Sequence, residues 1–191
     1  MQTTHAGMIE AVKDKIVAAV KGTGNIVQAT VDIVAQILAT TIKDTGKVGT
    51  SVTDAIADVA SGAIRGAAQV GVDLTQAAKG LMVGVLRGSK EAGTEVVDTI
   101  SHTAQVAVRD TAKIGGNLEA AATGLVQGAI QGAKELGVSA EEAAAAAAQG
   151  AFKGAGEVGS TAVEAVRKAV SKPINGVKVV LKEPAMAGSK N

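Results

Sequence analysis

The side chains that could perform acid, base or metal chemistry are few in this sequence and stand apart from one another. The two histidines, His5 and His102, are far apart, and neither has a second ligand at a spacing that suits a metal ion. A histidine in that setting is usually solvated or packed rather than a ligand or a general base. The chain has no Cys, which excludes disulfides, thiolate nucleophiles and thiolate metal sites.

Three short motifs could still suggest a site. The stretches 22–24 (Gly-Thr-Gly) and 115–117 (Gly-Gly-Asn) resemble fragments of phosphate loops, but neither completes such a motif or follows a predicted strand. The pair Glu141-Glu142 lies in the first turn of a predicted helix, where capping and the helix dipole explain acidic residues. We therefore predict no catalytic residue, no cofactor site and no metal site, and we expect a protein that is not an enzyme.

The composition argues against nucleic acid as a partner. There are 19 basic and 18 acidic residues, so the net charge of +1 provides no field that would attract a polyanion. Aromatic residues make up only 1% of the chain, with Phe152 alone, so bases would find no stacking platform. The apolar share of 47% comes from small side chains, which bury little area each and must pack closely or in many copies.

The sequence gives no sign of export or of a membrane-spanning helix. Residues 1–15 lack a basic segment followed by a long apolar run, so no secretory signal is predicted. The least charged stretches, residues 33–42 and 120–133, are shorter than the ~20 residues that a spanning helix needs. We expect a cytoplasmic protein, either free or peripheral to a membrane or granule.

A repeated unit of 22 residues organises the chain. Its five clearest copies begin at Gly62, Gly84, Val106, Gly128 and Gly150, and two more trace back to Thr40 and Ala18. This divides the chain into residues 1–17, an N-terminal lead and helix; residues 18–171, seven repeats; and residues 172–191, an extended or disordered tail. Residues 1–7 are expected to be frayed, and the tail after Pro173 to form at most one short strand.

Each unit has the pattern of an amphipathic helix. Twenty-two residues are twice eleven, and eleven residues make three turns close to the α-helical period. Counting from Gly62, position four is usually basic, as in Arg87 and Arg109, and position fifteen is usually acidic, as in Asp54 and Glu142. These charges predict a solvated ridge or lateral ion pairs between copies. The predicted fold is all-α, an array of about seven Gly/Ala-rich helical repeats with short turns, solenoid-like or bundle-like.

Glycine at position ten favours a break between successive helices. It recurs at Gly49, Gly71, Gly93, Gly115, Gly137 and Gly159. A capping residue follows each, namely Ser51, Asp73, Thr94, Asn117, Ser139 and Thr161. Gly after an apolar residue is the usual end of a helix, and a cap starts the next one. The alternative is one long, slightly right-handed helix that folds on a partner.

A second row of glycines predicts close helix packing. It consists of Gly80, Gly84, Gly88, Gly124, Gly128, Gly132, Gly150 and Gly154. Small residues at four-residue spacing let helix backbones approach closely. The row forms either a packing face between repeats of one chain or an oligomerisation face between copies.

The repeats also resemble a known class of sequence. Stretches such as TTIKDTGKVGTSVTDAIADVASGA and ATGLVQGAIQGAKELG resemble the 11-residue amphipathic repeats of perilipin-type lipid-droplet proteins, synucleins and late embryogenesis abundant proteins. The resemblance covers residues 18–171 and rests on the period, the small apolar residues and the scarcity of aromatics. It implies helices that form on a lipid surface or on drying.

Two functions follow from these patterns. The first is a non-catalytic structural protein that packs on copies of itself and forms an oligomeric scaffold, stalk or tube. The second is a peripheral coat that lays its apolar faces on a membrane, lipid droplet or storage granule. A stress-protective chain is a further possibility. The expected partners are thus the protein itself or a lipid surface, and no cofactor is expected.

Overall fold

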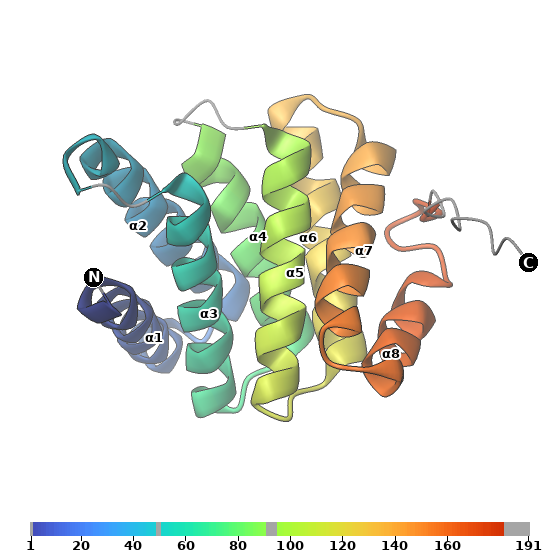
Figure 1. Ribbon diagram of the computed structural model, residues 1–191, viewed down its shortest axis with the longest axis horizontal. Coiled ribbons are helices and arrows are strands. Elements are labelled where there is room, and N and C mark those ends of the chain that lie inside the picture. Colours follow the sequence, from blue (N-terminus) through green and yellow to red (C-terminus); the bar gives the residue numbers. More distant parts are fainter. Residues whose placement is uncertain (1, 49–50, 91–94, 182–191) are drawn as a thin grey trace, which may run out of the picture.

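The computed structural model describes residues 2–48, 51–90 and 95–181, with side chains left out at 2–4, 23 and 44–48. These residues form eight α-helices, and their β pairing is limited to one isolated bridge (Figure 1). The helices are α1 (Gln2–Thr23), α2 (Ile26–Val48), α3 (Val52–Val70), α4 (Leu74–Lys90), α5 (Val96–Lys113), α6 (Leu118–Leu136), α7 (Ala140–Gly156) and α8 (Ser160–Val170). The prediction of an all-α repeat array is confirmed.

The helices form two layers, because each helix from α1 to α7 packs most extensively on a helix two places away along the chain. The layer of α1, α3, α5 and α7 lies in front in Figure 1, and α2, α4 and α6 lie behind it. From α3 to α7 the helices begin at residues 52, 74, 96, 118 and 140, which reproduces the period of 22. The repeat is therefore one helix and one short turn, so the segmented arrangement holds and the single long helix does not.

Glycines end two of the central helices. Gly71 and Gly137 have φ of 70° and 74°, the left-handed region that glycine adopts without a Cβ penalty. Their backbone N–H groups satisfy carbonyls of the last helical turn, as in a Schellman motif. Gly115 and Gly159 also lie in turns with positive φ. Gly49 and Gly93 lie outside the described residues.

Polar caps begin most of the helices where the sequence indicates. Ser51, Asn117 and Ser139 accept hydrogen bonds from backbone N–H groups of α3, α6 and α7, and Asp73 does so for α4. The prediction for Thr161 is wrong: Gly159, with a positive φ of 147°, occupies the N-cap position, so α8 begins at Ser160. Thr94 lies outside the described residues.

The second glycine row lies between helices of the same layer. Gly80, Gly84 and Gly88 face α2, Gly124, Gly128 and Gly132 face α4, and Gly150 and Gly154 face α5. A Cβ atom at Gly150 would lie 2.0 Å from the Ser101 carbonyl oxygen, so backbone meets backbone there. All eight glycines are buried. The faces are occupied by the chain's own helices, so a second copy cannot reach them in the folded monomer.

One junction of the front layer lacks this glycine contact. Gly62 and Gly66 of α3 face α1, whereas the corresponding positions of α5 hold Val106 and Asp110. Correspondingly α3 and α5 pack less extensively than α1 and α3 or α5 and α7. The hydroxyl of Ser61 donates a hydrogen bond to the buried Asp110 carboxylate across this junction. A polar contact therefore replaces close backbone packing between α3 and α5.

Both ends of the chain differ from the sequence-based expectation. Helix α1 begins at Gln2 rather than after a frayed lead, and His5 near its start binds Asp58 of α3. After α8, Ile174 and Val177 exchange two backbone hydrogen bonds of 2.9 Å around a two-residue turn. The turn residues Asn175 and Gly176 both have positive φ, which is typical of an Asn-Gly hairpin. The described part of the tail is thus a tight turn rather than one strand.

Candidate interaction surface

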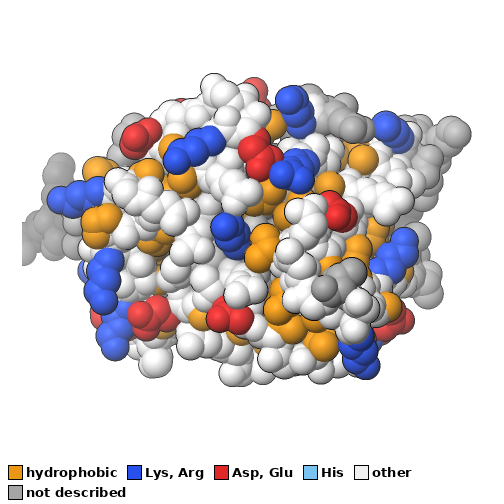
Figure 2. Space-filling model, turned by 180° about the vertical axis from the view of Figure 1, so that it is seen from behind, with side chains coloured by type: hydrophobic (Ala, Val, Ile, Leu, Met, Phe, Trp, Pro, Cys, Tyr) orange, Lys and Arg blue, Asp and Glu red, His pale blue; other side chains and the backbone are white. Residues whose placement is uncertain are grey.

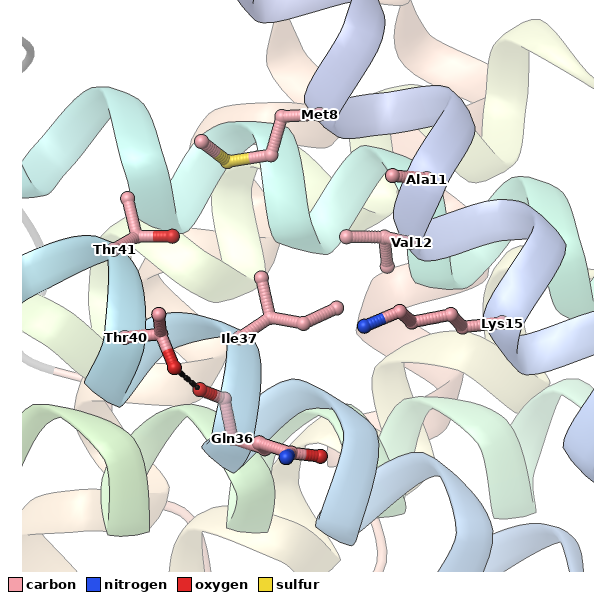
Figure 3. A pocket seen from close by; sticks show the side chains of 8 residues that line it. All are labelled: Met8, Ala11, Val12, Lys15, Gln36, Ile37, Thr40 and Thr41. Atoms are coloured by element: carbon pink, nitrogen blue, oxygen red, sulfur yellow. Dashed lines mark hydrogen bonds between the residues drawn. The ribbon is translucent and has the colours of Figure 1, made fainter.

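The first two helices leave an apolar pocket open at the N-terminal end of the array. The pocket has a volume of about 240 Å³. Its lining residues are Met8, Ala11, Val12 and Lys15 of α1 and Gln36, Ile37, Thr40 and Thr41 of α2 (Figure 3). In this view α1 and α2 are in the foreground, with later helices behind the pocket. We call the pocket-lining surface of α1 and α2 the N-terminal end face.

No other helix of the described residues packs over this face. Met8, Ile33 and Ile37 pack against the core from one side only and remain partly exposed. The window Ile26–Lys43 of α2 has a mean hydropathy of 1.3 but is only 28% buried. By length and composition alone this window could cross a membrane, which the shorter stretch 33–42 did not suggest. The kind of apolar surface that later helices bury against a neighbouring helix therefore remains partly exposed on α1 and α2.

The end face also differs from the internal repeats at the glycine positions. Gln36 and Thr40 stand at unit positions nineteen and one, where α4 has Gly80 and Gly84. Thr40 donates a hydrogen bond of 2.8 Å to the Gln36 carbonyl, and both residues are exposed. Their side chains would hold another helix further away than glycine does. A further helix could therefore not pack on this side of α2 as closely as α4 packs on its other side.

The opposite end of the array is covered. Helix α8 packs on both α6 and α7, and its Val166 and Val170 are buried. The tail turn places Ile174 and Val177 in the same core cluster. The outer residues of α8 include Arg167 and Lys168, which are exposed. The two ends are therefore unlike, and within the described chain the N-terminal end face is the one without a capping element.

Charges of both signs are mixed over the surface. On α1, Glu10, Asp14 and Lys15 are exposed close to one another, and Lys13 forms ion pairs with Glu10 and Asp14. Figure 2 shows the face formed by the even-numbered helices, where basic and acidic side chains are interspersed among apolar ones. The described residues of this face therefore offer no concentrated positive charge to a polyanion or an anionic membrane.

A second groove lies between the start of α5 and the start of α7. Val96, Val97 and Ile100 line it on one side, and Val138 and Ala143 on the other. Val97 and Val138 are 41% and 40% exposed, and Glu95 and Glu142 stand at the rim. Its volume of about 240 Å³ equals that of the N-terminal pocket.

The histidines occupy two different environments. His5 Nδ1 lies 2.6 Å from Asp58 Oδ2, and burial of that carboxyl raises the pKa of Asp58 although the His5 contact opposes the shift. His102 is half-buried on α5, and burial lowers its pKa because the charged ring would lose water. Its Nε2 has no hydrogen-bond partner among the described residues. The described part of the chain brings no three His, Asp or Glu side chains together in a way that suits a metal ion.

The other motifs that could suggest a site lie at helix ends. Gly24 and Gly115 are turn residues with positive φ, and Asn25 and Asn117 cap the helices that follow. The backbone N–H of Glu142 donates to the Ser139 hydroxyl at the start of α7. These motifs are therefore explained by turn and cap geometry.

Lateral ion pairs join alternate helices. Arg87 of α4 forms two hydrogen bonds with Glu135 of α6, of 2.8 and 3.0 Å. Arg109 of α5 lies 3.7 Å from Glu157, the residue that follows α7 and that also accepts a hydrogen bond from Gln105. Each pair joins a base at position four to an acid at position eight, two units further on, rather than at position fifteen. The pairs stabilise the layers and offer no reactive geometry.

The comparisons with known proteins support the fold. No protein family and no curated protein matches the sequence. Among solved structures, the chain is similar to the de novo designed helical repeat protein DHR7, with a TM-score of 0.56 and 20% identity. The similarity covers 88% of this chain and 91% of that one. At this identity it shows the fold alone, an array of helical repeats.

Proposed function

We propose that the protein is a non-catalytic helical-repeat scaffold that acts by associating with copies of itself. The observation that carries this proposal is the contrast between the ends of the array. The C-terminal end is closed by α8 and the tail turn, whereas the N-terminal end face carries an apolar pocket and half-buried side chains such as Met8 and Ile37. Partly exposed apolar side chains that line a pocket provide the apolar contacts that association between copies needs.

In this proposal the second glycine row is the packing face between repeats of one chain, the first of the two alternatives that the sequence left open. It sets the spacing of helices inside one chain, so self-association uses another surface. Gly84→Leu and Gly128→Leu would therefore unfold the chain rather than separate copies, since a Cβ atom at Gly128 would already lie 2.6 Å from the Lys79 carbonyl oxygen.

The mass of the purified protein tests the proposal. Far-UV circular dichroism and light scattering on one sample should give strong helicity and a defined mass above 18.8 kDa. A helical protein that stays at 18.8 kDa at every concentration would contradict self-association.

The apolar surface of α2 favours a second candidate, a peripheral coat of a membrane, lipid droplet or granule. In the window Ile26–Lys43 most residues are not fully buried, and interfacial helices use such surface to bind lipid. A monomer that floats with phosphatidylcholine vesicles in a density gradient would support this coat. Failure to bind vesicles that present packing defects would exclude it.

A further inference from the structure

We infer that two copies of the chain join N-terminal end face to N-terminal end face about a two-fold axis, giving a closed dimer. This inference rests on the proposed self-association and assigns its surface and its copy number. The occupant of the pocket between α1 and α2 is then the same surface of a second chain.

The first argument is continuity with the packing inside the chain. Along the array each helix covers the apolar side of the helix two places before it, as α3 covers α1 and α4 covers α2. Helices α1 and α2 bury the sides toward α3 and α4, where Val12 and Val34 are fully buried. The pocket lies between the same two helices and is lined by both the buried Val12 and the partly exposed Ile37. Two helices of another molecule could cover this pocket and extend both layers.

The second argument concerns which end of a second copy can reach this face. Head-to-tail stacking would need an open C-terminal end, but α8, Ile174 and Val177 close that end. The bulk of Gln36 and Thr40 at glycine positions would also hold a further helix at a greater distance, as the non-glycine residues at these positions do between α3 and α5. The N-terminal end of another copy carries the same apolar pocket, and contact between two identical surfaces is an isologous contact that closes after two chains.

The third argument is the self-complementarity of the polar groups around the pocket. A two-fold axis perpendicular to the helices makes the two α1 helices antiparallel, so Lys15 at the pocket of one chain can reach Asp14 at the edge of the α1 face of the other. The Gln36 amide and the Thr40 hydroxyl each hold donors and acceptors and can pair with their own kind. A lipid surface would instead favour a basic rim around a convex apolar strip, whereas this face is concave and of mixed charge.

Introduction of a negative charge at the pocket tests the interface without disturbing the core. Ala11 is exposed and lines the pocket, and Glu is a good helix former, so Ala11→Glu should leave the circular dichroism spectrum unchanged. In a two-fold dimer it brings two added like charges together and should raise the dissociation constant at least about tenfold. Ala68→Glu, at an exposed alanine of α3 outside the pocket, is the matched control and should retain the wild-type dissociation constant.

A single cysteine tests the two-fold symmetry, because the chain has none of its own. Oxidised Thr40→Cys should run as a covalent dimer at low concentration, since near a two-fold axis a residue meets its own copy, whereas Ala68→Cys should not.

The outcomes separate the two proposals. A wild-type monomer at all concentrations overturns self-association itself, and vesicle binding by that monomer would assign the face to lipid. An oligomer that is insensitive to Ala11→Glu, or whose mass grows beyond two copies, overturns the end-to-end dimer and leaves self-association standing. A wild-type dimer that Ala11→Glu dissociates and Thr40→Cys traps supports the inference.

Discussion

Gly124 of α6 lies so close to Thr75 of α4 that a Cβ atom on the glycine would be 2.1 Å from the Thr75 carbonyl oxygen. No side chain fits between the two backbones at this point. Helices at such distances gain dispersion contacts along their whole backbones, and Cα–H groups can contact carbonyl oxygens. A chain whose apolar residues are mainly Ala and Val can in this way build a dense core without aromatic side chains.

Replacement of this glycine by alanine should therefore separate α4 and α6. Gly124→Ala is expected to lower the free energy of unfolding by about 1–3 kcal/mol, as overpacking does in other cores. Gly156→Ala is the matched control, since no atom lies within 4 Å of its added Cβ, and it should be neutral or slightly stabilising. Urea denaturation followed by circular dichroism measures both. Equal stability of the two variants would contradict backbone contact at Gly124.

The pair of Arg87 and Glu135 should contribute modestly to stability. Both side chains are about two-fifths exposed, at 43% and 35%, so Arg87→Gln should cost only about 0.5–1 kcal/mol. The hydrogen bonds from Arg87 hold the pKa of Glu135 below its usual 4.5. This stabilisation is complete above pH 4.5 and is lost as the pH falls through the lowered pKa. A double-mutant cycle with Glu135→Gln measures it, and a coupling that survives full protonation would refute the ion pair.

His5 should stabilise the fold by partnering a buried carboxylate. His5→Ala leaves Asp58 ionised without its partner, which should cost about 1–2 kcal/mol near neutral pH. Because burial raises the pKa of Asp58 above 3.8, stability declines as the pH rises from 3.8 through that raised value. The His5→Ala penalty should shrink in acid, where Asp58 is protonated. Unfolding midpoints at several pH values check this, with Asp58→Asn as the variant that should remove this pH dependence.

His102 should make the fold sensitive to mild acid. Burial lowers its pKa below 6.5, so the folded state disfavours the charged ring. Stability is therefore retained above pH 6.5 and declines as the pH falls from 6.5 through the lowered pKa. His102→Gln, which cannot be charged, should remove this loss. Thermal unfolding of both proteins on either side of pH 6.5 measures the difference, and parallel pH profiles would show that His102 does not contribute.

The helices and their turns could be predicted because local chemistry specifies them. Gly71 and Gly137 end helices through φ values that other residues avoid, and Ser51 and Asn117 cap the next ones through their own side chains. The Asn175-Gly176 turn had an equally local signal, but the alternation of Val and Lys beyond it suggested a strand instead. The prediction of Thr161 as a cap was wrong because Gly159, two residues earlier, serves as the N-cap of α8.

The arrangement of the helices could not be predicted, since it depends on contacts between distant units. A 22-residue period specifies one helix, and it does not say whether that helix packs on its neighbour or on the helix after it. The partner of Arg87 is therefore Glu135, in the unit after next, and not an acid at position fifteen. The burial of Asp110 at a glycine position and its hydrogen bond from Ser61 could likewise not be predicted. Arg109 and Lys113 stand close to it in the sequence and suggest an exposed, charged segment.

The alternation of layers restricts how the length of this chain can change in evolution or engineering. Helices of one layer begin 44 residues apart, as α3 does at residue 52 and α5 at residue 96. Deletion of a single unit would transfer every later helix to the opposite layer and give each glycine row the wrong acceptor. Removal or duplication of two units at once keeps every helix in its layer. Lengthening or shortening of this array is therefore expected in steps of two helices.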